Sequence, residues 1–125
     1  MSANDRQVGG SHYKNGELEH WDVITDYGVG YLEGCATKYV ARWRKKDGVK
    51  DLQKSLHYCQ KLRELADNGY QPRGVVPIDV VDKFVEANGL NQHEHVALLN
   101  LLRWTSSANI AAAEAHITIL LEAAA

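Results

Sequence analysis

The feature that most constrains the fold is a helical spacing of apolar side chains on both sides of a short turn. From Val29 to Trp43 apolar residues recur every three or four positions, which is typical of an amphipathic helix. The segment KKDG follows, and Gly48 suits the positive φ angle that often ends a helix. A second helix is predicted from Val49 to Ala66. Because the turn is short, the two helices should form an antiparallel hairpin.

The second half of the chain carries further helix signals. A stretch rich in Gly and Pro, residues 67–77, predicts a linker. Pro77 suits the first turn of a helix that runs to about Ala87. Asn91, with Glu94 three residues later, resembles a capping box and predicts the start of the next helix.

No alternating strand pattern occurs, so the predicted fold is all-α: an antiparallel helical hairpin, preceded by an irregular N-terminal segment and followed by two or three helices. Their number depends on whether Ser106 or Ser107 caps a last helix or one helix continues with a kink. The predicted regions are 1–66, the linker 67–77 and 78–125. The apolar character of the last region predicts homo-oligomerisation.

Composition and size narrow the class of protein. The 125 residues and 45% apolar content are typical of one soluble globular unit. No apolar run is long enough for a bilayer and no secretory signal is apparent, so we expect a cytoplasmic protein without a membrane partner. Cys35 and Cys59 fall in apolar helical stripes and are predicted to be buried free thiols. His93 and His95 would lie on different sides of a helix, so no metal site is predicted.

The charges are distributed unevenly along the chain. Residues 1–37 carry two cations and six anions, residues 38–63 carry nine and two, and residues 64–125 carry three and eight. A positive block between two negative ones favours an anionic ligand over a general affinity for nucleic acid, which is therefore not expected as a partner.

The positive block includes a strip on the first predicted helix. In helical projection Gly34, Lys38 and Lys45 share this strip, and Arg42 lies between it and the apolar face. One interpretation is an anion-binding cradle, in which Gly34 lets a ligand approach the backbone and Arg42 binds phosphate through two donors. The other is a solvated basic face paired with Asp51 or with the acidic C-terminal residues. Asp51 could favour the helix N-terminus electrostatically, or orient Lys38 or Arg42.

Two further segments offer polar groups for a site. GGSHY, residues 9–13, could be a loop that folds over a ligand or an ordinary turn, and His12 is its candidate for proton handling or phosphate contact. His57 and Tyr58 are adjacent and point in different directions, and Tyr58 is predicted to face the first helix. The chain has no GxxxxGK[ST], GxGxxG or GxSxG motif, so any nucleotide chemistry would proceed without a P-loop.

Three blocks, GGSHY, GCATKYVARWRKK and DLQKSLHY, together resemble the phage nucleotide kinase family, a family of small phage domains that includes the deoxynucleoside monophosphate kinase of a T-odd coliphage. The resemblance covers about residues 8–65. Cys35 stands where that family has Asn. The matching residues are Ser11, His12, Tyr13, Gly34, Lys38, Tyr39, Arg42, Asp51, Leu52, Lys54 and Tyr58.

The resemblance implies a phage nucleotide-binding protein in the host cytoplasm, and first a (deoxy)nucleoside monophosphate kinase that uses ATP or another nucleoside triphosphate as donor. It implies catalytic roles for His12, Lys38 and Arg42, since cations neutralise charge on a transferred phosphoryl group. The substrate-binding residues that it implies are Ser11, Tyr13, Gly34, Tyr39, Lys45, Asp51, Lys54 and Tyr58. Two alternatives are a non-catalytic oligomer that sequesters a host nucleotide or defence signal, and an assembly or regulatory protein.

Overall fold

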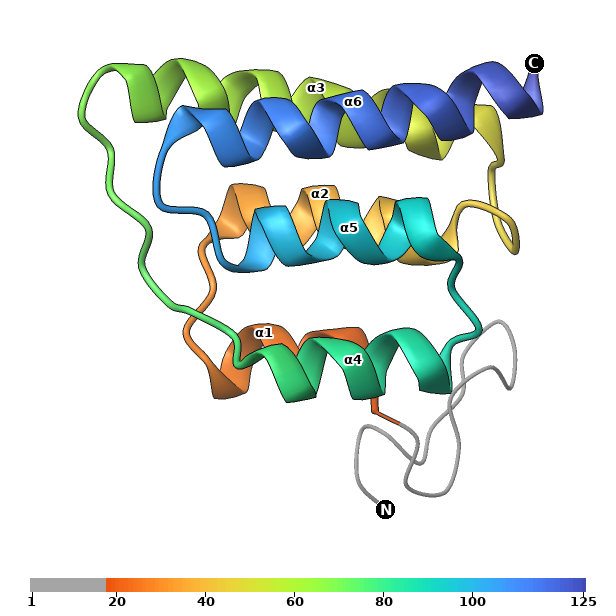
Figure 1. Ribbon diagram of the computed structural model, residues 1–125, viewed down its shortest axis with the longest axis horizontal. Helices are drawn as coiled ribbons and strands as arrows, with labels where there is room; N and C mark the ends of the chain where they lie inside the picture. The colour runs from red at the N-terminus through yellow and green to blue at the C-terminus, as the bar shows by residue number, and fades with distance from the viewer. Residues whose placement is uncertain (1–17) are drawn as a thin grey trace.

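The computed structural model describes residues 18–125, which contain six α-helices and no strand, as predicted for an all-α protein (Figure 1). Ser11, His12 and Tyr13 lie outside these residues. Within residues 18–125, no helix combines the length and apolar character needed to cross a bilayer. The helices are α1 (His20–Asp26), α2 (Tyr31–Arg42), α3 (Val49–Asp67), α4 (Ile78–Ala87), α5 (Gln92–Leu102) and α6 (Ser107–Ala124).

The predicted helical hairpin consists of α2 and α3. Gly48 has a φ angle of 60°, as predicted, although it is the N-cap of α3 and does not end α2. The turn between them is closed by the Gly48 amide, which donates to the Trp43 carbonyl at 2.8 Å. Because α2 already ends at Arg42, Lys45 lies in this turn and not on the helix.

The helices after the linker begin and end largely where the sequence indicated. The capping box of α5 is present: the Glu94 amide donates to Asn91 Oδ1 at 2.9 Å, and the Asn91 amide donates to Glu94 Oε1 at 2.7 Å. Ser106 is the N-cap of α6. The chain leaves the helical conformation at Arg103, where φ is −135°, so α5 and α6 are two helices and not one kinked helix.

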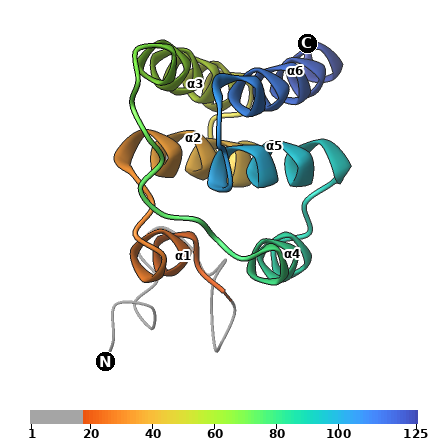
Figure 2. The same ribbon diagram turned by 60° about the vertical axis from the view of Figure 1, so that its left-hand side comes forward.

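The six helices form two copies of a three-helix unit, the first repeat (residues 18–67) and the second repeat (residues 78–124). Figures 1 and 2 show three layers, α1 with α4, α2 with α5 and α3 with α6, and the two helices of each layer run in opposite directions. Both repeats end their first helix alike. Gly28 and Gly89 have φ angles of 64° and 62°, and the next amide donates at 3.0 Å to the carbonyl five residues earlier. An approximate twofold axis therefore relates the repeats.

Two reciprocal hydrogen bonds join the repeats through α2 and α5. Trp43, directly after α2, donates from Nε1 to Oε2 of Glu94 near the start of α5 at 2.7 Å. Trp104, shortly after α5, donates from Nε1 to Oε2 of Glu33 near the start of α2 at 2.8 Å. Glu33 and Glu94 are only 2% and 1% exposed. A buried carboxyl group is costly without partners, so these bonds favour one antiparallel register of α2 and α5.

One hydrophobic core extends through both repeats. Ile110 and Ile117 of α6 are fully buried, and α6 packs on α3. Arg63 of α3 also pairs with Glu114 of α6 at 2.7 Å. Much of the apolar character that predicted homo-oligomerisation is thus buried within one chain, and the oligomeric state stays a prediction.

The short helix α1 packs closely on α2. A Cβ atom at Gly34 would lie 3.4 Å from Ile24, an ordinary van der Waals distance, so α1 and α2 are in direct contact at this glycine. Nε2 of His20 forms a 2.7 Å hydrogen bond with the Thr37 hydroxyl. Burial, helped by the charge of Lys38, lowers the pKa of His20 to about 4. His20 is therefore neutral at neutral pH.

We expect Trp104→Phe to lower the free energy of unfolding more than Trp43→Phe. Trp104 is the partner of Glu33, whose other carboxyl oxygen has no hydrogen bond within residues 18–125, whereas Glu94 keeps two further partners without Trp43. The expected difference is about 1–3 kcal/mol, the cost of leaving a buried polar group unpaired. Urea denaturation measures it.

The double variant Trp104→Phe/Glu33→Met controls for the lost volume of the indole. It should recover part of the loss, because replacing both partners by apolar groups leaves no buried polar atom unpaired. Equal losses in the two single variants, or no recovery in the double variant, would contradict the role given to this hydrogen bond.

Stability should fall between neutral pH and about pH 4, partly through His20. Its pKa is about 4 in the folded chain against 6.5 ordinarily, so between these values the unfolded chain binds a proton that the folded chain does not. The free energy of unfolding then decreases as the pH falls, by up to about 3 kcal/mol from this group. The measurement is the change in urea midpoint between pH 7.5 and pH 4.5. His20→Gln should make this change smaller, whereas His57→Gln, at an exposed histidine, should leave it as in the wild type. Equal slopes in all three proteins would refute the assignment.

Candidate functional site

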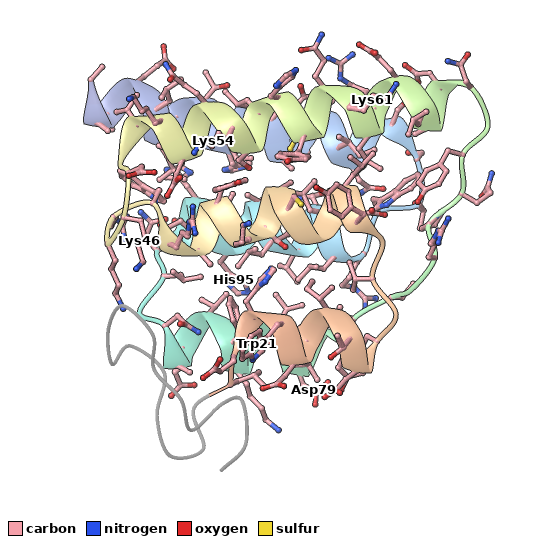
Figure 3. All side chains as sticks on the ribbon, turned by 180° about the vertical axis from the view of Figure 1, so that it is seen from behind. Trp21, Lys46, Lys54, Lys61, Asp79 and His95 are labelled. Carbon is pink, nitrogen blue, oxygen red and sulfur yellow. The ribbon has the colours of Figure 1, made fainter. Side chains whose placement is uncertain are left out.

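A groove lies between α2 and α3, on the side of the first repeat seen in Figure 3. Its volume is about 470 Å³, within the range of small-molecule sites. The residues from α3 recur at three- and four-residue spacing and so share one helix face. We call this cavity between the two helices the α2–α3 groove. Its lining residues are Leu32, Tyr39, Lys54, His57, Tyr58 and Lys61.

Positive charge near the groove gathers around the ring of Tyr39. Three cationic groups lie over or beside its ring: Lys38 Nζ is 4.6 Å from the ring centroid, Arg42 Cζ 4.9 Å and Lys54 Nζ 5.5 Å. The ring of Tyr58 stacks on Tyr39, with centroids 5.9 Å apart and planes inclined by 25°. Cations within about 6 Å of a ring face are attracted by its π electrons. The site thus combines an aromatic surface with a cluster of positive charge.

Arg42 is held by Asp51 across the hairpin. Arg42 Nε donates to Asp51 Oδ2 at 3.3 Å, and the Asp47 amide donates to the same oxygen at 3.4 Å. Asp51 is fully buried, whereas the Arg42 side chain is 33% exposed. The sequence offered Lys38 and Arg42 as partners of Asp51, and the structure pairs Asp51 with Arg42. This pairing orients the guanidinium beside Tyr39.

The other cations of the site are only weakly compensated. Lys54 lies 3.9 Å from Asp47, at the limit of an ion pair, and both side chains are about half exposed. Within residues 18–125, Lys38 and Lys61 form no ion pair. Figure 3 shows Lys54 and Lys61 along α3, with Lys46 apart from them near the turn after α2. Exposed pairs contribute about 0–1 kcal/mol, so the groove keeps positive charge for an anionic ligand.

Tyr58 faces α2, as predicted, and His57 is exposed at the groove. A side-chain hydrogen bond with Tyr31, helped by the nearby Cys35, raises the pKa of Tyr58 to about 12. The phenol is therefore protonated at physiological pH and can donate a hydrogen bond. The Tyr31 ring contacts it edge-on, with centroids 6.2 Å apart.

Gly34 and Lys45 do not line the α2–α3 groove. Gly34 is buried against Ile24 of α1, and with Lys38 it lines a separate cavity of about 230 Å³ between α1 and α2. Lys45 leaves the predicted strip because α2 ends before it. Sequence reasoning missed Lys61, although its spacing of seven from Lys54 is a signal for one face of α3.

The two cysteines differ in environment. Burial, with the charge of Glu114 as a smaller cause, raises the pKa of the Cys59 thiol to about 12, which makes it unreactive. Cys35 is only half-buried and lies beside Tyr58. The prediction of buried free thiols is confirmed for Cys59, while Cys35 is less buried than expected.

In a comparison with known protein families, residues 8–60 match a family described as "protein of unknown function (DUF3310)". Within the described residues, this match spans α1, α2 and most of α3, so it covers most of the first repeat and none of the second. No curated protein and no solved structure matches the chain.

These findings correct the family assignment drawn from the sequence. The family that matches the region of the three motif blocks is one of unknown function, and nothing links it to the phage nucleotide kinase family. The assignment to that kinase family was wrong. The catalytic roles given to His12, Lys38 and Arg42 lose their support from family likeness, so a function has to be argued from the groove itself.

Proposed function

We propose that the protein binds a phosphorylated ligand with an aromatic ring, a nucleoside phosphate, in the α2–α3 groove. The observation that carries this proposal is the position of Tyr39, which has three cations within 4.6–5.5 Å of its ring centroid at the edge of a cavity of about 470 Å³. Lysine and arginine bind phosphate oxygens through charge-assisted hydrogen bonds.

The groove offers separate surfaces for the two parts of such a ligand. The stacked rings of Tyr39 and Tyr58, with Leu32, form an apolar surface on which a base can pack. Lys54 and Lys61 are seven residues apart on α3, about 10 Å along the helix axis. Cations thus lie at both ends of the groove, a separation that suits an elongated phosphorylated ligand better than a lone phosphate.

The second repeat lacks the charge that this site needs. By the matched helix starts, Leu99, Asn100 and Ala112 occupy the positions that Lys38, Tyr39 and Lys54 occupy in the first repeat. We therefore propose one nucleotide site per chain, despite the two repeats.

The first experiment is a calorimetric titration of the full-length protein with deoxynucleoside and nucleoside monophosphates. Inorganic phosphate and the free nucleosides serve as comparisons. We expect one equivalent of monophosphate to bind, more tightly than either comparison, since only the monophosphate uses both surfaces. Binding of phosphate alone with equal affinity would reduce the site to an anion patch, and no binding of any monophosphate would refute the proposal.

Charge removal from the groove should weaken this binding. Lys54→Ala and Lys61→Ala are each expected to raise the Kd about tenfold or more, because each removes a charge-assisted contact. Lys83→Ala is the matched control, because Lys83 is an exposed lysine on α4, outside the groove. Arg42 is unsuitable as a first target, since its removal leaves the buried Asp51 without its ion-pair partner. Equal affinities in all three variants would place the ligand elsewhere.

Adding ATP to the same mixtures separates the sequence-based alternatives. Conversion of the monophosphate to a diphosphate would support phosphoryl transfer, in which Lys38 and Arg42 neutralise the charge of the transferred group. Chromatography of the nucleotides measures this conversion. Binding of the monophosphate without formation of a diphosphate would support sequestration.

A further inference from the structure

The second repeat contains two histidines in contact, and the sequence analysis did not predict this contact. His93 of α5 and His116 of α6 are both half-buried, and their Nδ1 atoms lie 3.0 Å apart. Their ring centroids are 5.2 Å apart, and the planes are inclined by 37°. His95, considered with His93 from the sequence, points elsewhere and forms a 2.8 Å contact with Asp82.

This pair occupies the place of the α2–α3 groove in the second repeat. When the repeats are matched, His93 corresponds to Leu32, and His116 corresponds to Tyr58, both of which line that groove. The same position between two helices has thus exchanged an apolar and aromatic lining for two imidazoles. This comparison concerns only the scaffold and does not depend on nucleotide binding.

The separation of the two nitrogens suits a shared metal ion. Imidazole nitrogens bind such metals at about 2.0–2.1 Å, and two of them 3.0 Å apart subtend an angle of roughly 95° at the ion. An angle near 90° fits the tetragonal geometry of Cu²⁺ and Ni²⁺ better than the tetrahedral geometry of Zn²⁺. Imidazole is a ligand that both ions favour.

We propose that His93 and His116 form a two-histidine site for Cu²⁺ or Ni²⁺, with water completing the coordination. When both rings are neutral, one Nδ1 carries the proton of the present hydrogen bond. Coordination through both Nδ1 atoms moves that proton to Nε2 of the same ring, and no net proton is released. Within the part of the chain that the structure describes, no group of three or more His, Cys, Asp or Glu residues is placed to hold a metal. The coordination positions beyond the two imidazoles are therefore left to water.

The surroundings of the pair are compatible with a cation. A cavity of about 250 Å³ beside His93 leaves room for coordinated water. Arg44 also lines this cavity, but its guanidinium lies 3.0 Å from Glu94 Oε1, so its charge is compensated. Glu114, on the same helix as His116, pairs with Arg63.

The test is a titration of tag-free, full-length protein with Ni²⁺ by calorimetry and with Cu²⁺ by electron paramagnetic resonance, near pH 7.5. We expect one equivalent of metal with nitrogen ligands. His93→Gln and His116→Gln should each weaken binding about tenfold or more, since even outer-shell changes cost that much. His95→Gln is the matched control, because it removes a histidine from the same helix without touching the pair.

A second measurement avoids reliance on the variants' folding. Adding Ni²⁺ to wild-type protein should broaden the ring resonances of His93 and His116 selectively in nuclear magnetic resonance spectra. Absence of stoichiometric binding, or binding that both Gln variants retain in full, would show that the pair is a hydrogen bond only. A thiolate absorption band with Co²⁺ would place the metal at Cys35 and also overturn the proposal.

Discussion

The reciprocal hydrogen bonds of Trp43 with Glu94 and of Trp104 with Glu33 constrain the rest of the structure. They fix α2 against α5 in the middle layer, because a shift in register would leave two buried carboxyl groups without these partners. With that layer fixed, α3 and α6 pack on each other above it. One side of α2 is then committed to the core, and Tyr39 is left at the groove with α3.

A nearly symmetric backbone carries two chemically different faces. The first repeat holds cations and tyrosines beside its groove, and the second holds small, apolar, amide and imidazole side chains at the matching positions. The core that both repeats share maintains the scaffold, so the outward positions are free to differ. A ligand site in one repeat therefore does not imply the same site in the other. The family match, which ends within α3, agrees with a unit of one repeat.

Helical spacing predicted the hairpin and local sequence predicted the Asn91 capping box, because these depend on residues close together in the chain. Whether a break precedes α6 was left open by the sequence. The repeat was missed, since few identities mark it: an Arg-Trp pair at the C-terminal end of α2 and of α5, and an acid at the same distance before each pair. For the site, Tyr39, Lys54 and Tyr58 were predicted and do come together. The contact of Gly34 with Ile24 was not predictable, because α1 meets α2 only in the folded chain.

The sequence by itself determined the helices, their approximate ends and the concentration of positive charge between residues 38 and 63, because periodicity, caps and charge are properties of short segments. Only the tertiary structure decided which cations surround Tyr39, that Asp51 orients Arg42 and that His93 meets His116. These contacts depend on how helices distant in sequence cross, and that crossing is set by core packing and by buried hydrogen bonds such as those of the two tryptophans.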